Sequence, residues 1–397
     1  MAVPSSISSS EALALAPAQA ARTAGAADRY ARQTAADRPG MAQPVPVRPV
    51  PQQPWGRILA FVLVLLALLL AAWEGYWRAY GVTPSISNSN GLWAMQRRRI
   101  DQGEGAATVL VGDSRLFFDL RLPVWAQLDG ERPIQLSLEG TSARWTLEDL
   151  AADPRFSGGR LLIGVAPDVF FSGFPSRAEA IRYARKETPA QRVGQWLAMH
   201  LIEPYLAFDD PDYALATVLA RQPWPERTAR RLPVRKLAMT ENDRNSYLWS
   251  KVEQDQAYRD IARGIWLNHM QRLPGDPPAR EDLKNARQQI TKVAAAVATL
   301  RARGVQVLFV RLPSNGPYLA YENRKYPRAL TWDVLLKESG APGIHFEDYP
   351  ELQGYDIPEW SHLSYRDSER FTAALQGIVQ RKFWGPAAPH PVPQQGP

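Results

Sequence analysis

The chain has 397 residues, of which 45% are hydrophobic, and it carries a formal charge of +7 and no cysteine. This length allows one large domain or two modest ones, and the missing cysteine excludes disulfides, thiol catalysis and cysteine-ligated zinc or iron–sulfur sites. The charge is modest, and the arginine clusters at 97–99 and 227–231 fit a solvated surface or a lipid-headgroup contact better than a nucleic-acid site. We therefore expect no nucleic-acid partner.

The chain is expected to begin and end in disordered tails. Residues 1–54 are rich in Ala, Ser, Pro and Gln, and they contain too few large apolar side chains to offset their ordering entropy. The stretch PVPVRPVPQQP at 44–54 favours polyproline II. Residues 384–397 have a similar composition and form the second predicted tail.

An uninterrupted apolar run, ILAFVLVLLALLLAAW, covers residues 58–73. At about 1.5 Å per residue it spans roughly 24 Å, and the flanking Trp55, Tyr76 and Trp77 extend it into an interfacial aromatic belt. A buried core helix is the alternative, but such a helix seldom lacks any polar position. A cleaved signal peptide has a short leader, whereas more than fifty residues precede this run. The pattern predicts a membrane-spanning signal anchor at 55–78.

The basic residues around this run predict its orientation. Arg48 and Arg57 lie on the N-terminal side, whereas Glu74 and Arg78 cancel on the other side. Because positive flanks stay in the cytoplasm, we expect a single-pass protein of the inner membrane with a cytoplasmic N-terminus. A linker at 79–104 then leads to an extracytoplasmic, periplasmic domain.

Buried strands alternate with helices in the rest of the chain. Short apolar runs with few charges predict strands at 108–111, 134–138, 161–165 and 305–310, and helical patterns cover 283–303 and 368–382. Such alternation is typical of a parallel sheet covered on both faces. Residues 105–383 are therefore expected to form a three-layer α/β/α, flavodoxin-like domain.

Residues 176–280 break this alternation. The stretch is rich in Arg, Trp, Tyr and Pro, and it contains helical runs such as 191–206 but no convincing strand. It is interpreted as a helical insertion that acts as a lid or a docking surface.

The first strand runs into Gly112-Asp113-Ser114-Arg115. A serine just beyond the carboxyl end of a buried parallel strand occupies the place where α/β folds bind ligands, and the following helix N-terminus offers free N–H groups. The alternative is that Asp113 or Ser114 only caps that helix.

A nucleophilic serine needs a base, usually a histidine that a carboxylate orients. Of the five histidines, four lie in the insertion, in an apolar stretch or in the C-terminal tail: His200, His269, His345 and His390. His362 instead lies in the sequence EWSHLS just before the last helix, three residues after Glu359. A loop histidine beside a capping serine is the alternative for this motif.

Together, Gly-Asp-Ser at 112–114 and Glu-x-x-His at 359–362 resemble the motifs of the SGNH, or GDSL-type, hydrolases. The resemblance implies that Ser114 is the nucleophile, His362 its base and Glu359 the orienting acid. It also implies an oxyanion hole made by the N–H groups of Ser114 and of Gly140 in LSLEGTS.

The third motif of that family, Gly-x-Asn-Asp, is altered here. Asp168 is present, but Pro167 stands where the oxyanion-binding Asn is expected. The loss of one such donor lowers turnover by about a hundred- to a thousand-fold. Asn315, in the loop after the strand at 305–310, is the candidate substitute.

A membrane anchor joined to an SGNH-like domain resembles the accessory proteins of cell-envelope polysaccharide O-acylation. This resemblance implies a bilayer, a multi-spanning membrane acyltransferase and a polysaccharide as partners. Two functions stay open: an esterase or O-acyltransferase that works through a Ser114 acyl intermediate, and a degraded domain that binds a glycan or scaffolds a membrane complex. We expect neither a cofactor nor a metal.

Overall fold

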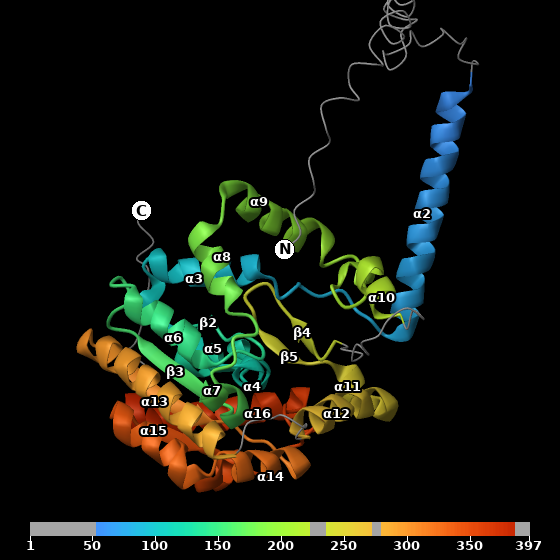
Figure 1. Ribbon diagram of the computed structural model, residues 1–397. Coiled ribbons are helices and arrows are strands. Elements are labelled where there is room, and N and C mark those ends of the chain that lie inside the picture. Colours follow the sequence, from blue (N-terminus) through green and yellow to red (C-terminus); the bar gives the residue numbers. More distant parts are fainter. Residues whose placement is uncertain (1–52, 223–235, 272–278, 386–397) are drawn as a thin grey trace, which may run out of the picture. The chain divides into compact units, whose positions relative to one another are not determined.

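The computed structural model describes residues 53–222, 236–271 and 279–385 (Figure 1). The chain divides into two compact units, Met1–Ala67 and Leu68–Pro397. Most of the two predicted tails, 1–52 and 386–397, and the arginine cluster at 227–231 lie outside the described residues.

The apolar run forms one helix, α2 (Trp55–Tyr80), which begins in the first unit and ends in the second. Within the described ranges, it is the one helix long and apolar enough to cross a membrane, and its most apolar window is not buried inside the protein. The helix could therefore serve as a membrane anchor, as the sequence predicts.

The second unit is built on a sheet of five parallel strands in the order β2-β1-β3-β6-β7. The strands are β1 (Thr108–Val111), β2 (Ile134–Gln135), β3 (Arg160–Val165), β6 (Gln306–Arg311) and β7 (Gly343–His345). The predicted parallel α/β fold is confirmed, and the order is flavodoxin-like. The chain runs to opposite sides of β1 to form β2 and β3, so a crevice forms at the carboxyl end of β1, where such folds bind ligands.

The strands differ from the prediction in two places, and both places concern a short strand. Of the predicted strand at 134–138, only β2 is assigned as a strand. The N–H groups of Leu136 and Leu138 nevertheless donate hydrogen bonds to carbonyls at the end of β1 and just after it. Strand β7 covers the stretch around His345, which the sequence marks only as packed and apolar. Its three residues are too few to show a pattern in the sequence.

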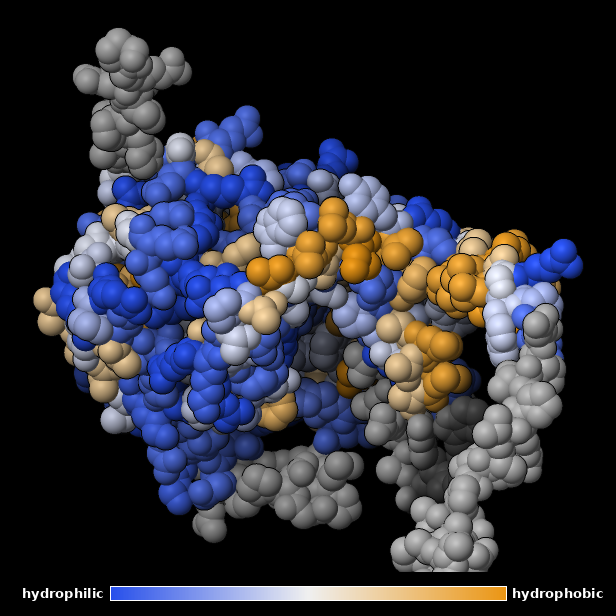
Figure 2. Space-filling model, turned by 90° about the horizontal axis from the view of Figure 1, so that it is seen from above, coloured by the Kyte–Doolittle hydropathy of each residue, from blue (hydrophilic) through white to orange (hydrophobic). Residues whose placement is uncertain are grey.

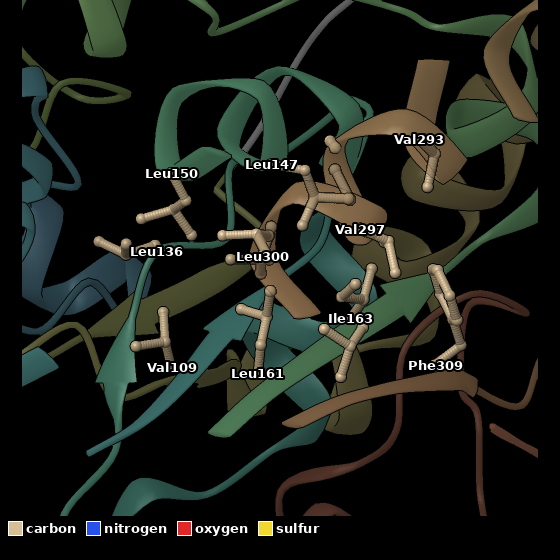
Figure 3. Packing of buried hydrophobic residues seen from close by; sticks show 14 of the residues in the cluster. Val109, Leu136, Leu147, Leu150, Leu161, Ile163, Val293, Val297, Leu300 and Phe309 are labelled. Atoms are coloured by element: carbon tan, nitrogen blue, oxygen red, sulfur yellow. The ribbon is translucent and has the colours of Figure 1, made fainter. Parts of the chain in front are cut away.

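Alternate side chains of the strands point to opposite faces of the sheet. On one face, Val109, Leu161, Ile163 and Phe309 pack against helices α6 (Ala143–Ala152) and α13 (Ala279–Ala302), as Figure 3 shows. On the other face, Leu110, Leu162 and Leu308 pack against α5 (Leu122–Asp129) and α16 (Tyr365–Val379). Both faces are therefore covered by helices.

The stretch at 79–104, predicted as a linker, contains helix α3 (Asn90–Asp101), which packs into the core. Trp93 is fully buried and donates its indole N–H to the carbonyl of Leu136 at 3.0 Å. Arg97 is buried as well and pairs with Asp149 and Asp153. Arg97 thus stabilises the domain internally, so the expectation of a solvated or lipid-facing surface is wrong for this residue of the first cluster.

The insertion at 176–280 is mostly helical where it is described: α8 (Glu179–Lys186), α9 (Pro189–Leu197), α10 (Leu215–Arg221), α11 (Ser250–Gln254) and α12 (Gln256–Met270). It also contains an antiparallel hairpin, β4 (Ala238–Thr240) and β5 (Ser246–Leu248), where no strand was expected. In its turn, Arg244 has a φ of 65° and is completely buried. Arg244 donates to the carbonyls of Gln135 and Ser137, which ties the hairpin to the edge of the main sheet.

Candidate active site

The Gly-Asp-Ser motif forms the turn from β1 into helix α4 (Ser114–Asp119). A Cβ added to Gly112 would lie 2.7 Å from the Cβ of Leu116, so this position needs glycine. Asp113 caps α4 by accepting the N–H of Arg115 at 3.1 Å, and capping stabilises a helix start by about 1 kcal/mol. The capping alternative is thus right for Asp113, and it leaves the Ser114 hydroxyl available for another contact.

A chain of hydrogen bonds connects the turn at Ser114 with the loop before α16. His362 Nε2 lies 2.9 Å from Ser114 Oγ, and His362 Nδ1 lies 2.7 Å from Glu359 Oε1. Glu359 Oε1 also accepts the backbone N–H of His362 at 2.6 Å. Because a carboxylate only accepts, it holds the ring proton on Nδ1 and leaves Nε2 to accept the serine proton. Serine, histidine and acid thus stand in the order of a catalytic triad.

Trp266 completes this series from the insertion. It lies on α12 and donates its indole N–H to Glu359 Oε2, so both oxygens of the carboxylate are engaged. Glu359 and His362 are almost completely buried. No signal in the sequence identifies Trp266, because it lies 93 residues before Glu359 and on a separate helix.

Nearby charges and burial shift the pKa values of His362 and Glu359 in opposite directions. Burial lowers the pKa of His362, but the adjacent Glu359 carboxylate outweighs burial and raises this pKa above its ordinary value. Burial likewise raises the pKa of Glu359, but its contacts with His362 and Trp266 keep the net pKa below its ordinary value. Glu359 therefore stays ionised and stabilises the protonated form of His362.

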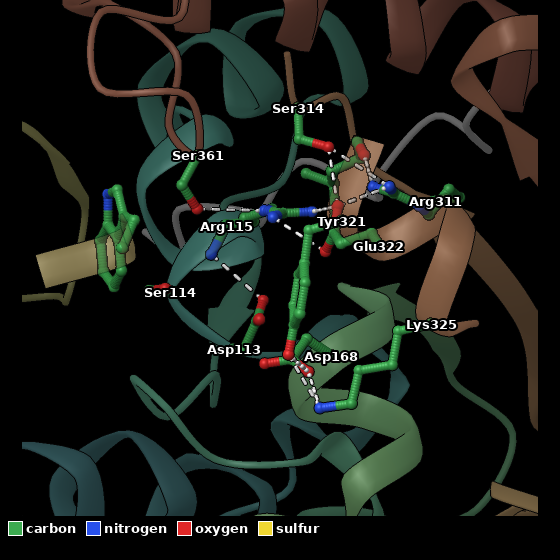
Figure 4. A network of polar contacts seen from close by, with 12 residues as sticks. Asp113, Ser114, Arg115, Asp168, Arg311, Ser314, Tyr321, Glu322, Lys325 and Ser361 are labelled. Carbon is green, nitrogen blue, oxygen red and sulfur yellow. Dashed lines mark hydrogen bonds and ion pairs between the residues drawn. The ribbon is translucent and has the colours of Figure 1, made fainter. Parts of the chain in front are cut away.

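A second buried network positions α4. Arg115 is completely buried, pairs with Glu322 at 2.9 Å and donates to the hydroxyl of Ser361 at 3.2 Å (Figure 4). Glu322 belongs to α14 (Gly316–Lys325) and also pairs with Arg311 of β6 at 2.9 Å. Because Ser361 lies between Glu359 and His362 in the chain, Arg115 connects the helix of the nucleophile to the loop of its base.

Ser114 and His362 line a cavity of about 400 Å³. Gly140 lines the same cavity from the turn after β2, where its φ is +56°. Neither the N–H of Ser114 nor that of Gly140 donates a hydrogen bond to another described residue. Both of these lining residues thus have a backbone N–H without a partner in the described ranges, and an oxyanion hole requires such donors.

The other two predicted residues do not reach this cavity. Asp168 is buried and accepts from the Tyr321 hydroxyl at 3.1 Å and from Lys325 Nζ at 2.9 Å (Figure 4). Bonds to His269 and Lys325 outweigh burial and lower the Asp168 pKa to about 2, so Asp168 holds helices together. Asn315 is the N-terminal cap residue of α14 and is absent from the cavity lining.

Pro167 is the first residue of helix α7 (Pro167–Ser172), and its neighbour Ala166 lines the cavity. Proline has no N–H and no side-chain donor, so the position expected to supply an oxyanion donor supplies none.

A different amide, that of Asn88, lines the cavity. Its Oδ1 accepts from Nε and Nη2 of Arg244 at 3.2 and 2.9 Å, whereas its Nδ2 has no partner among the described residues. Because arginine only donates, these bonds fix which end of the amide faces Arg244 and leave the N–H₂ end free. Asn88 lies in the stretch predicted as a linker, so the sequence did not indicate that it lines the cavity.

In the ranges described, no group of three or more His, Asp and Glu side chains is arranged to hold a metal ion. No protein-family model matches the chain, and no curated protein matches it either. The case for a function therefore rests on the geometry of the residues.

Proposed function

We propose that the protein is a membrane-anchored esterase or O-acyltransferase of the SGNH type that forms an acyl intermediate on Ser114. The observation that carries the proposal is the series Ser114–His362–Glu359, with contacts of 2.9 and 2.7 Å, at the edge of a cavity. The flavodoxin-like strand order and the two motifs at 112–114 and 359–362 support the same assignment.

In this mechanism His362 Nε2 takes the Ser114 proton while Oγ attacks the carbonyl carbon of an acyl ester. Negative charge develops on the carbonyl oxygen, and the N–H groups of Ser114 and Gly140 stabilise it. The tetrahedral species then expels the alcohol, which receives the proton from His362, and the acyl group stays on Ser114. Water or an acceptor hydroxyl next gives its proton to His362 and takes the acyl group.

A polysaccharide is the proposed source or acceptor of the acyl group. Several of the side chains that line the cavity are polar, among them Asn88, Glu139, Asp210 and Asp212, and such groups can bind the hydroxyls of a sugar. The arginines before the apolar run favour an extracytoplasmic domain at the inner membrane, and a multi-spanning membrane acyltransferase is the proposed partner.

Trapping of the acyl intermediate tests the proposal. The full-length protein in detergent is incubated with an activated acetyl ester, quenched in acid and digested. We expect mass spectrometry to find an acetyl group on the peptide that carries Ser114, and to find none there in the Glu359→Gln variant, because attack then lacks an oriented base. An unmodified Ser114 peptide in the wild type would contradict the proposal.

The second candidate is a non-catalytic protein that binds a glycan or scaffolds a membrane complex. The observation that favours it is Pro167, which removes the expected third oxyanion donor. In that case the trapping experiment finds no acetyl adduct, although the cavity still binds an oligosaccharide.

Asn88 is expected to replace the missing donor. Asn88→Ala should lower turnover by about a hundred- to a thousand-fold, because one oxyanion donor contributes about that much. Asn315→Ala is the matched control, and it should leave turnover unchanged because Asn315 does not line the cavity. Asn88→Asp keeps an acceptor for Arg244 but has no N–H, so it separates loss of the donor from loss of Arg244's partner. Equal losses in the Asn88 and Asn315 variants would contradict this role.

The pH dependence of hydrolysis should follow the protonation of His362. Only the neutral ring can accept the Ser114 proton, so kcat/KM should fall as the pH drops through the His362 pKa. Because Glu359 raises that pKa above 6.5, we expect the midpoint of this fall above pH 6.5. A pH profile of kcat/KM for an acetyl ester measures it, and a midpoint below pH 6 would show that Glu359 does not act on His362 as described.

A further inference from the structure

Helix α9 and the π-helical turn η3 (Ala198–Ile202) that follows it carry large apolar side chains on their exposed side. Five of them, together with Tyr205 in the turn after η3, are 40–63% exposed, and we call this set the apolar face: Val193, Trp196, Leu197, Leu201, Ile202 and Tyr205. Figure 2 shows apolar side chains gathered in a band on the side of the molecule turned to the viewer. An exposed apolar patch of this kind marks a contact with a membrane or another protein.

Along α9 and the turns after it, two polar side chains face the protein while large apolar side chains face outward. Gln195 turns toward the protein, where its Oε1 accepts the Ser89 hydroxyl at 2.6 Å. Glu203 is 7% exposed and accepts the N–H of Ser87 at 3.1 Å. The neighbouring Trp196 and Leu201 are instead 54% and 61% exposed. A surface helix in water buries its apolar stripe, so this arrangement fits a helix whose outer side meets an apolar medium.

The apolar face is continuous with the end of α2. Arg78 donates to the carbonyl of Tyr205 at 2.8 Å, and Glu74 accepts the N–H groups of Ala207 and Phe208, both at 3.0 Å. The apolar run of α2 ends at Trp73, so Glu74 and Arg78 stand where a spanning helix leaves the hydrocarbon. The chain just beyond the apolar face is therefore fastened to the interfacial turns of α2.

The charges around the apolar face also suit a lipid surface. Between residues 189 and 208 the one acidic residue is Glu203, which is buried, whereas Arg192 and His200 are exposed, and Arg192 also pairs with Glu187 at 3.1 Å. No exposed carboxylate in this stretch would repel anionic headgroups. Tryptophan and tyrosine, which the face contains, are the residues that favour the membrane interface.

We propose that the apolar face of α9 and η3 lies in the interface of the bilayer that α2 spans. The inference rests on the proposed anchoring by α2, and it adds a second, lateral contact that orients the domain. Interfacial helices of this type insert their apolar side by about 5–10 Å. Asp210, Pro211 and Asp212 line the Ser114 cavity and follow this segment closely, so one wall of the cavity stands beside the membrane surface.

The absence of cysteine allows a direct test, because an introduced cysteine is then the only one in the chain. The full-length Leu201→Cys variant carries an environment-sensitive fluorophore and is reconstituted into vesicles of phosphatidylethanolamine and phosphatidylglycerol. Leu330→Cys is the matched control, since Leu330 is 51% exposed outside the apolar face, and Val64→Cys reports on α2 itself. Nitroxide-bearing lipids then quench any fluorophore that contacts lipid.

We expect the Leu201 label to lose fluorescence more strongly with a nitroxide near the headgroup than with one near the chain end. The Val64 label should show the reverse preference, and the Leu330 label should lose none. If the Val64 label is quenched and the Leu201 label is not, the inference is overturned while the anchor stands. An unquenched Val64 label overturns both. A Leu201 label that is shielded from water but not quenched by lipid indicates contact with a second copy of the chain and also overturns it.

Discussion

Replacement of Ser114 by alanine is expected to lower acetyl-ester hydrolysis by at least about four orders of magnitude. The substitution removes the one atom that can attack the carbonyl, whereas the buried His362–Glu359 pair stays intact. Ser114 Oγ contacts His362 at 2.9 Å and lines the cavity, so its loss leaves no void in the hydrophobic core. The melting temperature should therefore hardly change.

Ser142→Ala is the matched control for this variant. Ser142 is buried and donates to the carbonyl of Phe170 at 3.0 Å, but it does not line the cavity. Its replacement should cost about 1 kcal/mol of stability and leave the rate per folded molecule unchanged. Wild-type activity in Ser114→Ala, or a comparable loss in Ser142→Ala, would show that the assigned nucleophile is wrong.

Glu359→Gln is expected to reduce kcat by about 10⁴, the effect of an acid-to-amide change in a comparable triad. Oε1 of Glu359 accepts two N–H groups of His362, and Oε2 accepts the indole N–H of Trp266. All three contacts need an acceptor, but an amide offers only one acceptor atom. Either the ring of His362 takes the wrong tautomer or the contact with Trp266 is lost.

Trp266→Phe separates these two possibilities. It keeps the Glu359 carboxylate and removes only one donor, so we expect a clearly smaller loss of kcat than in Glu359→Gln. Steady-state kinetics and thermal melts of both variants make the comparison. A loss below about tenfold in Glu359→Gln, worth roughly 1.4 kcal/mol, would mean that Glu359 does not orient His362.

Much of the site could be predicted because a parallel sheet brings its strand ends together. Ser114 follows the first strand, His362 precedes the last helix, and both elements pack near the carboxyl edge of the sheet. The chemistry of serine and histidine was then enough to predict that Ser114 and His362 form a nucleophile and its base. The same argument fails for Asp168 and Asn315, since a place after a strand does not say which way a side chain points.

The features that were missed depend on contacts between distant parts of the chain. Trp266 and Asn88 come from segments predicted as an insertion and a linker, and neither segment carries a motif. The strands of the β4–β5 hairpin have three residues each, too few to show alternation. The burial of Arg97 depends on two aspartates more than fifty positions away in the chain, and no local pattern reports such a pairing.

The insertion is therefore part of the candidate site. Its α12 supplies the indole of Trp266, and its hairpin supplies Arg244, which orients Asn88. Removal of the insertion would leave one Glu359 oxygen without its donor and the Asn88 amide free to turn. An interpretation of 176–280 as a separate lid or docking surface alone does not account for these contacts.

Labelling with a fluorophosphonate tests the central claim most directly, because the probe reacts only with a serine whose hydroxyl is activated. The full-length protein is treated with the probe, and the modified residue is mapped by mass spectrometry. We predict a single adduct on Ser114 that is lost after denaturation and strongly slowed in Glu359→Gln. A wild-type protein that stays folded but carries no adduct on Ser114 would contradict the account.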